Sequence, residues 1–110
     1  MPGPQTLARG NIILAGVYQL TISPASVAAN TTAEQTFTLT GLALNDGVFV
    51  AKPTVQAGLT VVSARVSAAN TLAITFGNFT ASPIVPTAGE IYTVKLNRTE
   101  NGPPYPTSVT

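Results

Sequence analysis

The stretch that most constrains the fold is residues 59–79, which contains two runs of alternating apolar and polar or small residues. In the second run, Leu72, Ile74 and Phe76 alternate with threonine and alanine. Successive side chains of a strand point to opposite faces of a sheet, so this run predicts a strand with one buried face. A chain built around such a strand is expected to be a β protein.

The first run predicts the partner of that strand. It offers Val62, Ala64 and Val66 as core-facing side chains and turns Arg65 outward. The break between the two runs, residues 67–70, is short and contains serine and asparagine. Such a break between alternating runs is typical of a β-hairpin. We therefore predict a central hairpin over residues 59–79.

Four further alternating runs lie on either side of the hairpin, at residues 18–23, 34–40, 48–51 and 90–97. Each is bounded by proline, glycine or asparagine, and an Asp-Gly turn is expected at Asp46. Short strands with turn signals about every ten residues, without sustained helical periodicity, indicate a single antiparallel β-sandwich. The inward residues expected outside the hairpin are Tyr18, Leu20, Ile22, Phe37, Leu39, Tyr92, Val94 and Leu96, and the aromatic residues Phe49, Phe76 and Phe79 are assigned to the core with them.

The chain divides into residues 1–17, an N-terminal arm or edge strand, residues 18–97, the β-sandwich domain, and residues 98–110, a Pro-rich C-terminal tail. The first segment opens with prolines, which fix φ and remove donors, and leaves open whether it is an edge strand or an arm on a neighbouring subunit. Its apolar part is far shorter than the roughly 20 residues of a membrane span. The prolines of the tail prevent it from pairing as a central strand.

Charged residues make up only 8% of the chain, and there is no histidine and no cysteine. Ordinary globular domains carry roughly 25% charged residues. The net charge of +1 provides no basic surface for nucleic acid. Few charges are compatible with a threonine-rich β surface, but they also match surfaces that lie against partner subunits, and we favour the second interpretation.

The residue inventory predicts no catalytic, cofactor-binding or metal-binding residue, and no cofactor. The four carboxylates, Glu34, Asp46, Glu90 and Glu100, are scattered over separate elements. A distant Glu34–Glu90 pair as glycosidase acids is possible in principle, but nothing else in the sequence supports it. Tyr105 is the one aromatic residue in the tail and is the candidate for a contact outside the core.

Three sites match the N-glycosylation pattern, at Asn30, Asn78 and Asn97. In a chain so rich in threonine, matches to a three-residue pattern are expected by chance. We interpret all three as chance matches.

Residues 22–37, 48–53 and 64–76 carry a resemblance that spans residues 21–96. They resemble a small domain of structural proteins of tailed bacteriophages, among them capsid decoration (cement) proteins, head fibres and parts of tails. The resemblance implies a non-enzymatic protein on the virion, at the capsid surface, and it carries over no catalytic residue. This chain departs from the family at Asn45-Asp46-Gly47, where a plainer Gly-Asp turn is expected.

The leading hypothesis is a capsid decoration protein that binds the major capsid protein and stabilises the head shell. We expect a homo-oligomer, a trimer, because three-fold symmetry suits the three-fold positions of an icosahedral shell. Neither nucleic acid nor a membrane is an expected partner. The alternative is a receptor- or carbohydrate-binding module of a tail or head fibre, although this chain has no tryptophan and few spare tyrosines for stacking on sugars.

Overall fold

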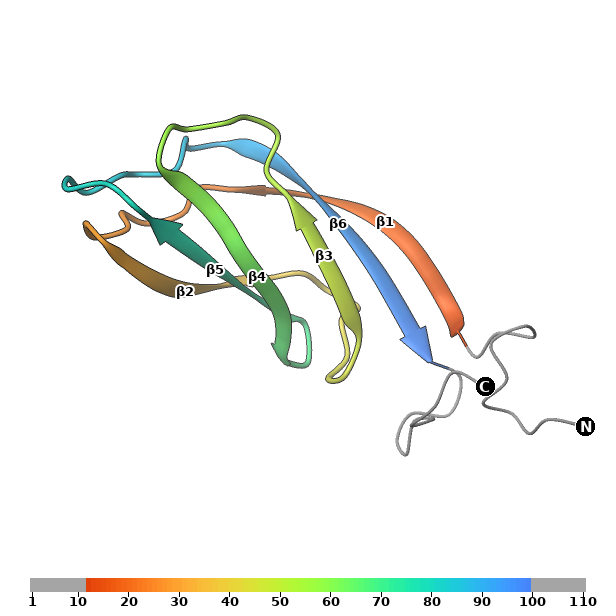
Figure 1. Ribbon diagram of the computed structural model, residues 1–110. Helices are drawn as coiled ribbons and strands as arrows, with labels where there is room; N and C mark the ends of the chain where they lie inside the picture. The colour runs from red at the N-terminus through yellow and green to blue at the C-terminus, as the bar shows by residue number, and fades with distance from the viewer. Residues whose placement is uncertain (1–11, 100–110) are drawn as a thin grey trace, which may run out of the picture.

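The computed structural model describes residues 12–99, and this part of the chain contains only β-strands as regular structure. β1, β6 and β3 form one antiparallel sheet, called the first sheet, and β2, β5 and β4 form the second sheet (Figure 1). The all-β prediction is thus confirmed. The strands are β1 (Ile12–Ile22), β2 (Thr31–Thr38), β3 (Gly47–Ala51), β4 (Leu59–Ala68), β5 (Thr71–Asn78) and β6 (Glu90–Thr99).

The two sheets face each other across one core, to which the middle strand of each contributes most. Phe76 of β5 and Tyr92 of β6 are both fully buried, and their rings meet edge to face with centroids 6.4 Å apart. This geometry is the one that aromatic pairs prefer. The inward faces predicted for β5 and β6 are therefore confirmed. The buried side chains of these two strands are Leu72, Ile74, Phe76, Tyr92, Val94 and Leu96.

The central hairpin is confirmed, but one of its inward residues is not. Val61 lies opposite Phe76 and Ser63 opposite Thr75, so the ladder between β4 and β5 shifts at Val62. An extra residue in one strand turns the side chains that precede it to the other face. Val62 is consequently 51% exposed on the outer face, and Val61 packs against the core in its place.

β1 is an edge strand that pairs with β6 along its length, from Ile12 opposite Thr99 to Ile22 opposite Glu90. Of the two alternatives for the first segment, the edge strand is therefore the one observed for residues 12–17. β6 continues through Arg98 and Thr99, two residues that the sequence assigned to the tail. The expected arm at residues 1–10, the rest of the Pro-rich tail and Tyr105 lie outside the described residues.

The segment between β2 and β3 turns one residue earlier than predicted. Asn45 has a φ of 76° and the Asp46 N–H donates to Ala43 C=O, so the turn precedes Gly47, which begins β3. Asparagine is among the few residues that adopt this left-handed conformation readily. The side chain of Asp46 accepts from the N–H of Ala43 in the same turn and also contacts Arg98.

Asn78, at the end of β5, fixes the loop that follows it. Its side-chain amide is fully buried and donates to the carbonyls of Val27 and Ser82, at 3.1 and 2.8 Å. Its oxygen accepts from the N–H and the hydroxyl of Thr80. A buried amide with these four partners has no room for a glycan, which agrees with the interpretation of this site as a chance match.

Candidate binding surface

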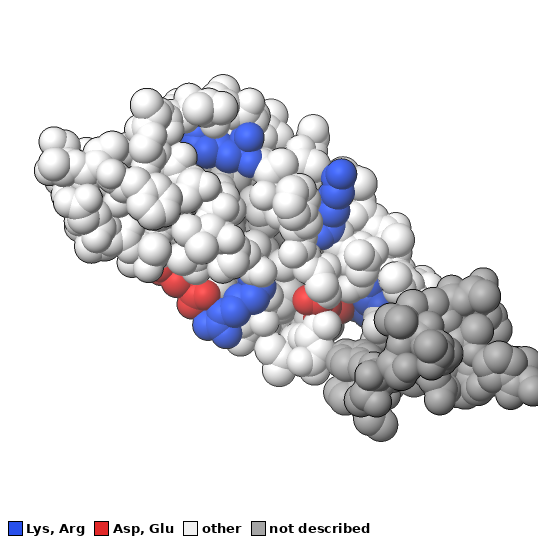
Figure 2. Space-filling model, viewed as in Figure 1, with Lys and Arg blue, Asp and Glu red and all other residues white. Residues whose placement is uncertain are grey.

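Six of the seven charged side chains in residues 12–99 are used in ion pairs within the chain. Lys95 is the exception within that range. The surface in Figure 2 is largely uncharged, with the few acidic and basic side chains scattered over it. This part of the molecule therefore offers few free charges for the electrostatic recognition of a partner. The three pairs are Lys52–Glu90, Arg65–Glu34 and Arg98–Asp46.

Asp46 and Arg98 hold the β2–β3 segment against β6. The guanidinium donates to both carboxylate oxygens, at 2.8 and 2.7 Å, and to the carbonyl of Gly41 at 2.7 Å. Asp46 also accepts from the N–H of Ala43 and is buried. The hydrogen bonds from Arg98 lower the pKa of this carboxyl. With every oxygen of Asp46 used in this way, the pair has a structural role.

Replacing Asp46 with alanine should destabilise the protein by about 2–3 kcal/mol, because it removes a buried carboxylate that accepts several hydrogen bonds. Asp46→Asn, which keeps an acceptor for the N–H of Ala43, should lose less. Urea melts of the two variants check this. Equal losses would show that the acceptor kept by asparagine contributes nothing and that the whole effect comes from the charge contact with Arg98.

Lys52 and Glu90 form a second pair, where the β3–β4 loop meets the start of β6. The ammonium lies 2.8 Å from Glu90 and also donates to the hydroxyl and carbonyl oxygens of Thr54. The Thr54 hydroxyl in turn donates to the second carboxylate oxygen. Both charged side chains are about nine-tenths covered. Hydrogen bonds from Lys52, and then from Thr54, lower the pKa of Glu90.

The third pair crosses the outer face of the second sheet. Arg65 makes two hydrogen bonds to Glu34, at 2.8 and 2.9 Å, and the Arg65 hydrogen bond lowers the pKa of this carboxyl. Arg65 lies directly opposite Ala73, which is fully covered although it is on this outer face. Glu34 and Glu90 are thus each engaged with their own cation, which gives the glycosidase alternative no further support.

Stability should depend on pH only outside a broad plateau. The pKa values of Glu34, Asp46 and Glu90 are lowered in the folded state, so their contribution is complete above the ordinary carboxyl pKa of about 4. It is lost as the pH falls through the lowered values. Burial, followed by the charge of Glu90, raises the pKa of Tyr92 from 10.0 to about 12. The unfolded chain therefore ionises first, and stability falls as the pH rises from 10 to 12.

Tyr92→Phe tests the alkaline limb. The Tyr92 hydroxyl is buried and has no hydrogen-bond partner among the described residues, so its removal should gain about 1 kcal/mol at neutral pH. The gain should grow above pH 10, where the phenol of the unfolded wild type ionises. Denaturant melts of the two proteins from pH 7 to 11 measure this. A constant difference between them would contradict the assigned pKa shift.

The outer face of the first sheet carries an apolar surface that the strand registers place together. Val17, Lys95 and Phe49 lie directly opposite one another on β1, β6 and β3. Val17 is 65% exposed and Phe49 62%, and the Lys95 ammonium lies 6.0 Å from the centre of the Phe49 ring. Ile91, farther along β6, is also exposed. Exposed apolar residues gathered on one face mark interaction sites.

Phe49 and Phe79 correct the assignment of aromatic residues to the core. Phe49 stands between Val48 and Val50, whose side chains take the inward positions of β3. Phe79 is 70% exposed and lies over Gly77, where an added Cβ would be 3.4 Å from the ring and 2.9 Å from Val62. The second sheet therefore also carries an exposed aromatic residue.

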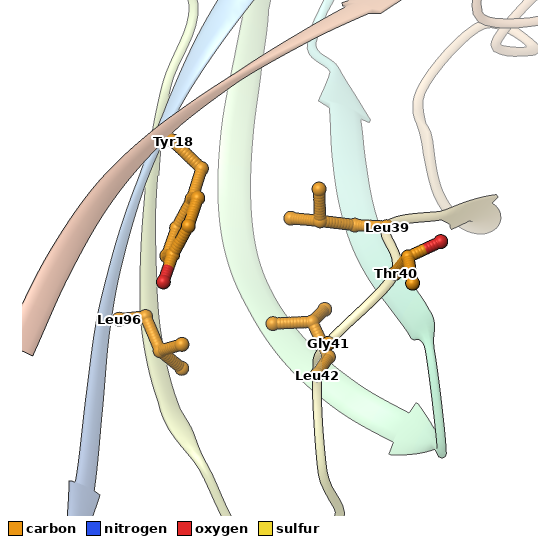
Figure 3. A pocket seen from close by; sticks show the side chains of 6 residues that line it. All are labelled: Tyr18, Leu39, Thr40, Gly41, Leu42 and Leu96. Atoms are coloured by element: carbon orange, nitrogen blue, oxygen red, sulfur yellow. The ribbon is translucent and has the colours of Figure 1, made fainter. Parts of the chain in front are cut away.

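A small hollow of about 20 Å³ lies between the first sheet and the β2–β3 segment (Figure 3). Tyr18 and Leu96 line one side of it, with Leu39 and Leu42 on the other. The ring of Tyr18 extends over Gly16, where a Cβ would lie only 2.9 Å from it. A space of this size holds about one water molecule, too little for an organic substrate.

Residues 12–99 contain no group of three or more histidine, cysteine, aspartate or glutamate residues placed to hold a metal ion. No helix long and apolar enough to cross a membrane occurs there.

Comparison with known proteins finds no family model that matches this sequence, and no curated protein or solved structure that is significantly similar to it.

Proposed function

We propose that this chain is a non-enzymatic structural protein of a bacteriophage virion, and specifically a capsid decoration (cement) protein on the head shell. The resemblance over residues 21–96 motivates the proposal. The observation that carries it is the outer face of the first sheet, with Val17 and Phe49 exposed on either side of Lys95. In this proposal that face contacts the major capsid protein.

The composition of that face suits a protein partner. The centres of protein interfaces are depleted in charge and enriched in aromatic residues. Phe49 provides an aromatic anchor, and the exposed Val17 and Ile91 extend the apolar area along the sheet. Lys95 is the one cation of the described chain that has no carboxylate partner within it, and it would find an acceptor on the shell.

The proposal includes self-association, for which the sequence leads us to expect a trimer at a three-fold position of the shell. The N-terminal arm and the Pro-rich tail, as expected from the sequence, are further candidates for contact with the shell. Sedimentation of the purified protein gives the number of copies.

Binding of the purified protein to empty head shells tests the assigned face. Phe49→Thr should lower the amount that sediments with the shells at least about tenfold, since it removes an interface anchor. Phe79→Thr is the matched control, because it removes a similarly exposed aromatic residue that lies over the other sheet. Equal binding by wild type and Phe49→Thr would exclude this face as the contact.

A receptor- or carbohydrate-binding module of a fibre is the second candidate function. Exposed Phe79 favours it, because sugars stack on aromatic rings and Phe79 stands out on the second sheet beside Val62. In this case the protein would bind the host surface or its isolated glycans rather than head shells, and Phe79→Thr would be the variant that loses binding.

A further inference from the structure

Among residues 12–99, no strand pairs with the outer edge of β1 along its whole length. This strand has 11 residues, and of the strands that the structure describes it pairs with β6 alone. In an antiparallel ladder alternate residues direct their N–H and C=O groups to opposite sides, so about half of these residues face away from β6. Within residues 12–99, the single backbone hydrogen bond that β1 makes outside its ladder is from the N–H of Gly89 to Ile22, at the end of the strand.

That edge also lacks the features that prevent unwanted pairing. Natural proteins protect edge strands with charges, prolines, bulges or short length. β1 contains no charged residue and no proline, and its one irregularity lies between Ile12 and Leu14, at one end. Each of the other edge strands is protected: β2 carries Glu34, β4 carries Arg65, and β3 has five residues and lies beside β4.

We propose that β1 pairs with β1 of a second copy of this chain, antiparallel and about a two-fold axis at Val17. The two first sheets then become one continuous sheet of six strands. Val17 is the middle residue of β1, so an axis there pairs the strands over their full length. No charge faces a like charge in this contact, whereas stacking the outer faces of two first sheets would bury two copies of Lys95 together.

This inference goes beyond the proposed function and does not depend on it. A contact about a two-fold axis uses the same surface on both copies and closes as a dimer. It therefore predicts a dimer, whereas the proposed function includes a trimer, and the copy number of the purified protein separates the two. The same exposed face of the first sheet remains available to another protein, and becomes twice as large.

Single cysteines test the register, because the chain has none of its own. Val17→Cys should form a disulfide-linked dimer under mild oxidation, since residues opposite each other across an antiparallel pair have Cβ atoms about 5 Å apart. Ala15→Cys alone should not, because its copies are about 13 Å apart along the strands. A mixture of Ala15→Cys and Gln19→Cys should link, since these two positions face each other. Thr36→Cys, on edge strand β2, is the control that should form no disulfide-linked dimer.

Sedimentation of the full chain tests the contact without cysteines. The wild type should be a dimer, and Val17→Lys should raise the dimer dissociation constant at least about tenfold, because it sets two like charges opposite each other. Val17→Thr, which is also polar but uncharged, should change it much less. Val17 is exposed, so the monomer fold should survive both changes, and an unchanged thermal melt confirms that. A wild-type monomer, a trimer, or a dimer indifferent to Val17→Lys would overturn the proposal.

Discussion

Phe76→Ala should cost about 3–5 kcal/mol of unfolding free energy, the largest loss expected from a single truncation in this chain. Phe76 is fully buried on β5, and its ring meets that of Tyr92 at the centre of the core. Its removal leaves a cavity between two sheets whose backbones are each fixed by a ladder on both sides of the middle strand. The core cannot close around that space without breaking the ladders, so the cost should lie in the upper part of the range.

The matched control is Thr75→Ala, one residue earlier on the opposite face of β5. Thr75 lies on the outer face between Glu34 and Ser63, so its loss should cost about 1 kcal/mol or less. Urea melts of both variants give the comparison. Similar losses for the two would mean that the register of the central hairpin is wrong.

Asn78→Asp should destabilise the protein by about 3 kcal/mol or more at neutral pH. The substitution keeps the size of the side chain but replaces the amide that donates to the carbonyls of Val27 and Ser82. A carboxylate would face both oxygens in a site closed to water. The loss should shrink at acidic pH, where the carboxyl is protonated and donates again.

Asn97→Asp is the control, because Asn97 matches the same three-residue pattern but is exposed on β6. It should change stability by less than about 0.5 kcal/mol. Chemical melts at pH 7 and pH 4 measure both effects. A small, pH-independent loss for Asn78→Asp would show that the loop after β5 rearranges around the charge.

The inward faces of β5 and β6 were predictable because their side chains alternate without interruption. The outward position of Val62 was not predictable. The extra residue in β4 leaves the alternating sequence pattern intact, but it changes which face of the sheet the side chains of that pattern lie on. Phe49 was not predictable either. It lies in an apolar run, Val48 to Ala51, in which burial of either face satisfies the pattern.

The ion pairs lay beyond sequence reasoning for a different reason. Asp46 and Arg98 are 52 residues apart and meet because β6 continues past Asn97, after which the tail was expected to begin. The sequence indicates the role of Asn78 only in part. An asparagine at the end of an apolar strand can be recognised, but Val27, to whose carbonyl it donates, is 51 residues away in the sequence. The binding surface was also predictable only in part. The low charge of the chain predicted that some surface lies against a partner, and only the strand registers show where the exposed apolar residues lie together.

The position of the protein on purified virions tests the proposed function most directly. Virions should be imaged with and without this protein, and the density difference assigned to the head or the tail. The proposed function predicts additional density on the outside of the capsid, repeated with the symmetry of the shell, and loss of that density when Phe49→Thr replaces the wild type. Density confined to the tail or its fibres, with a bare capsid, would contradict it.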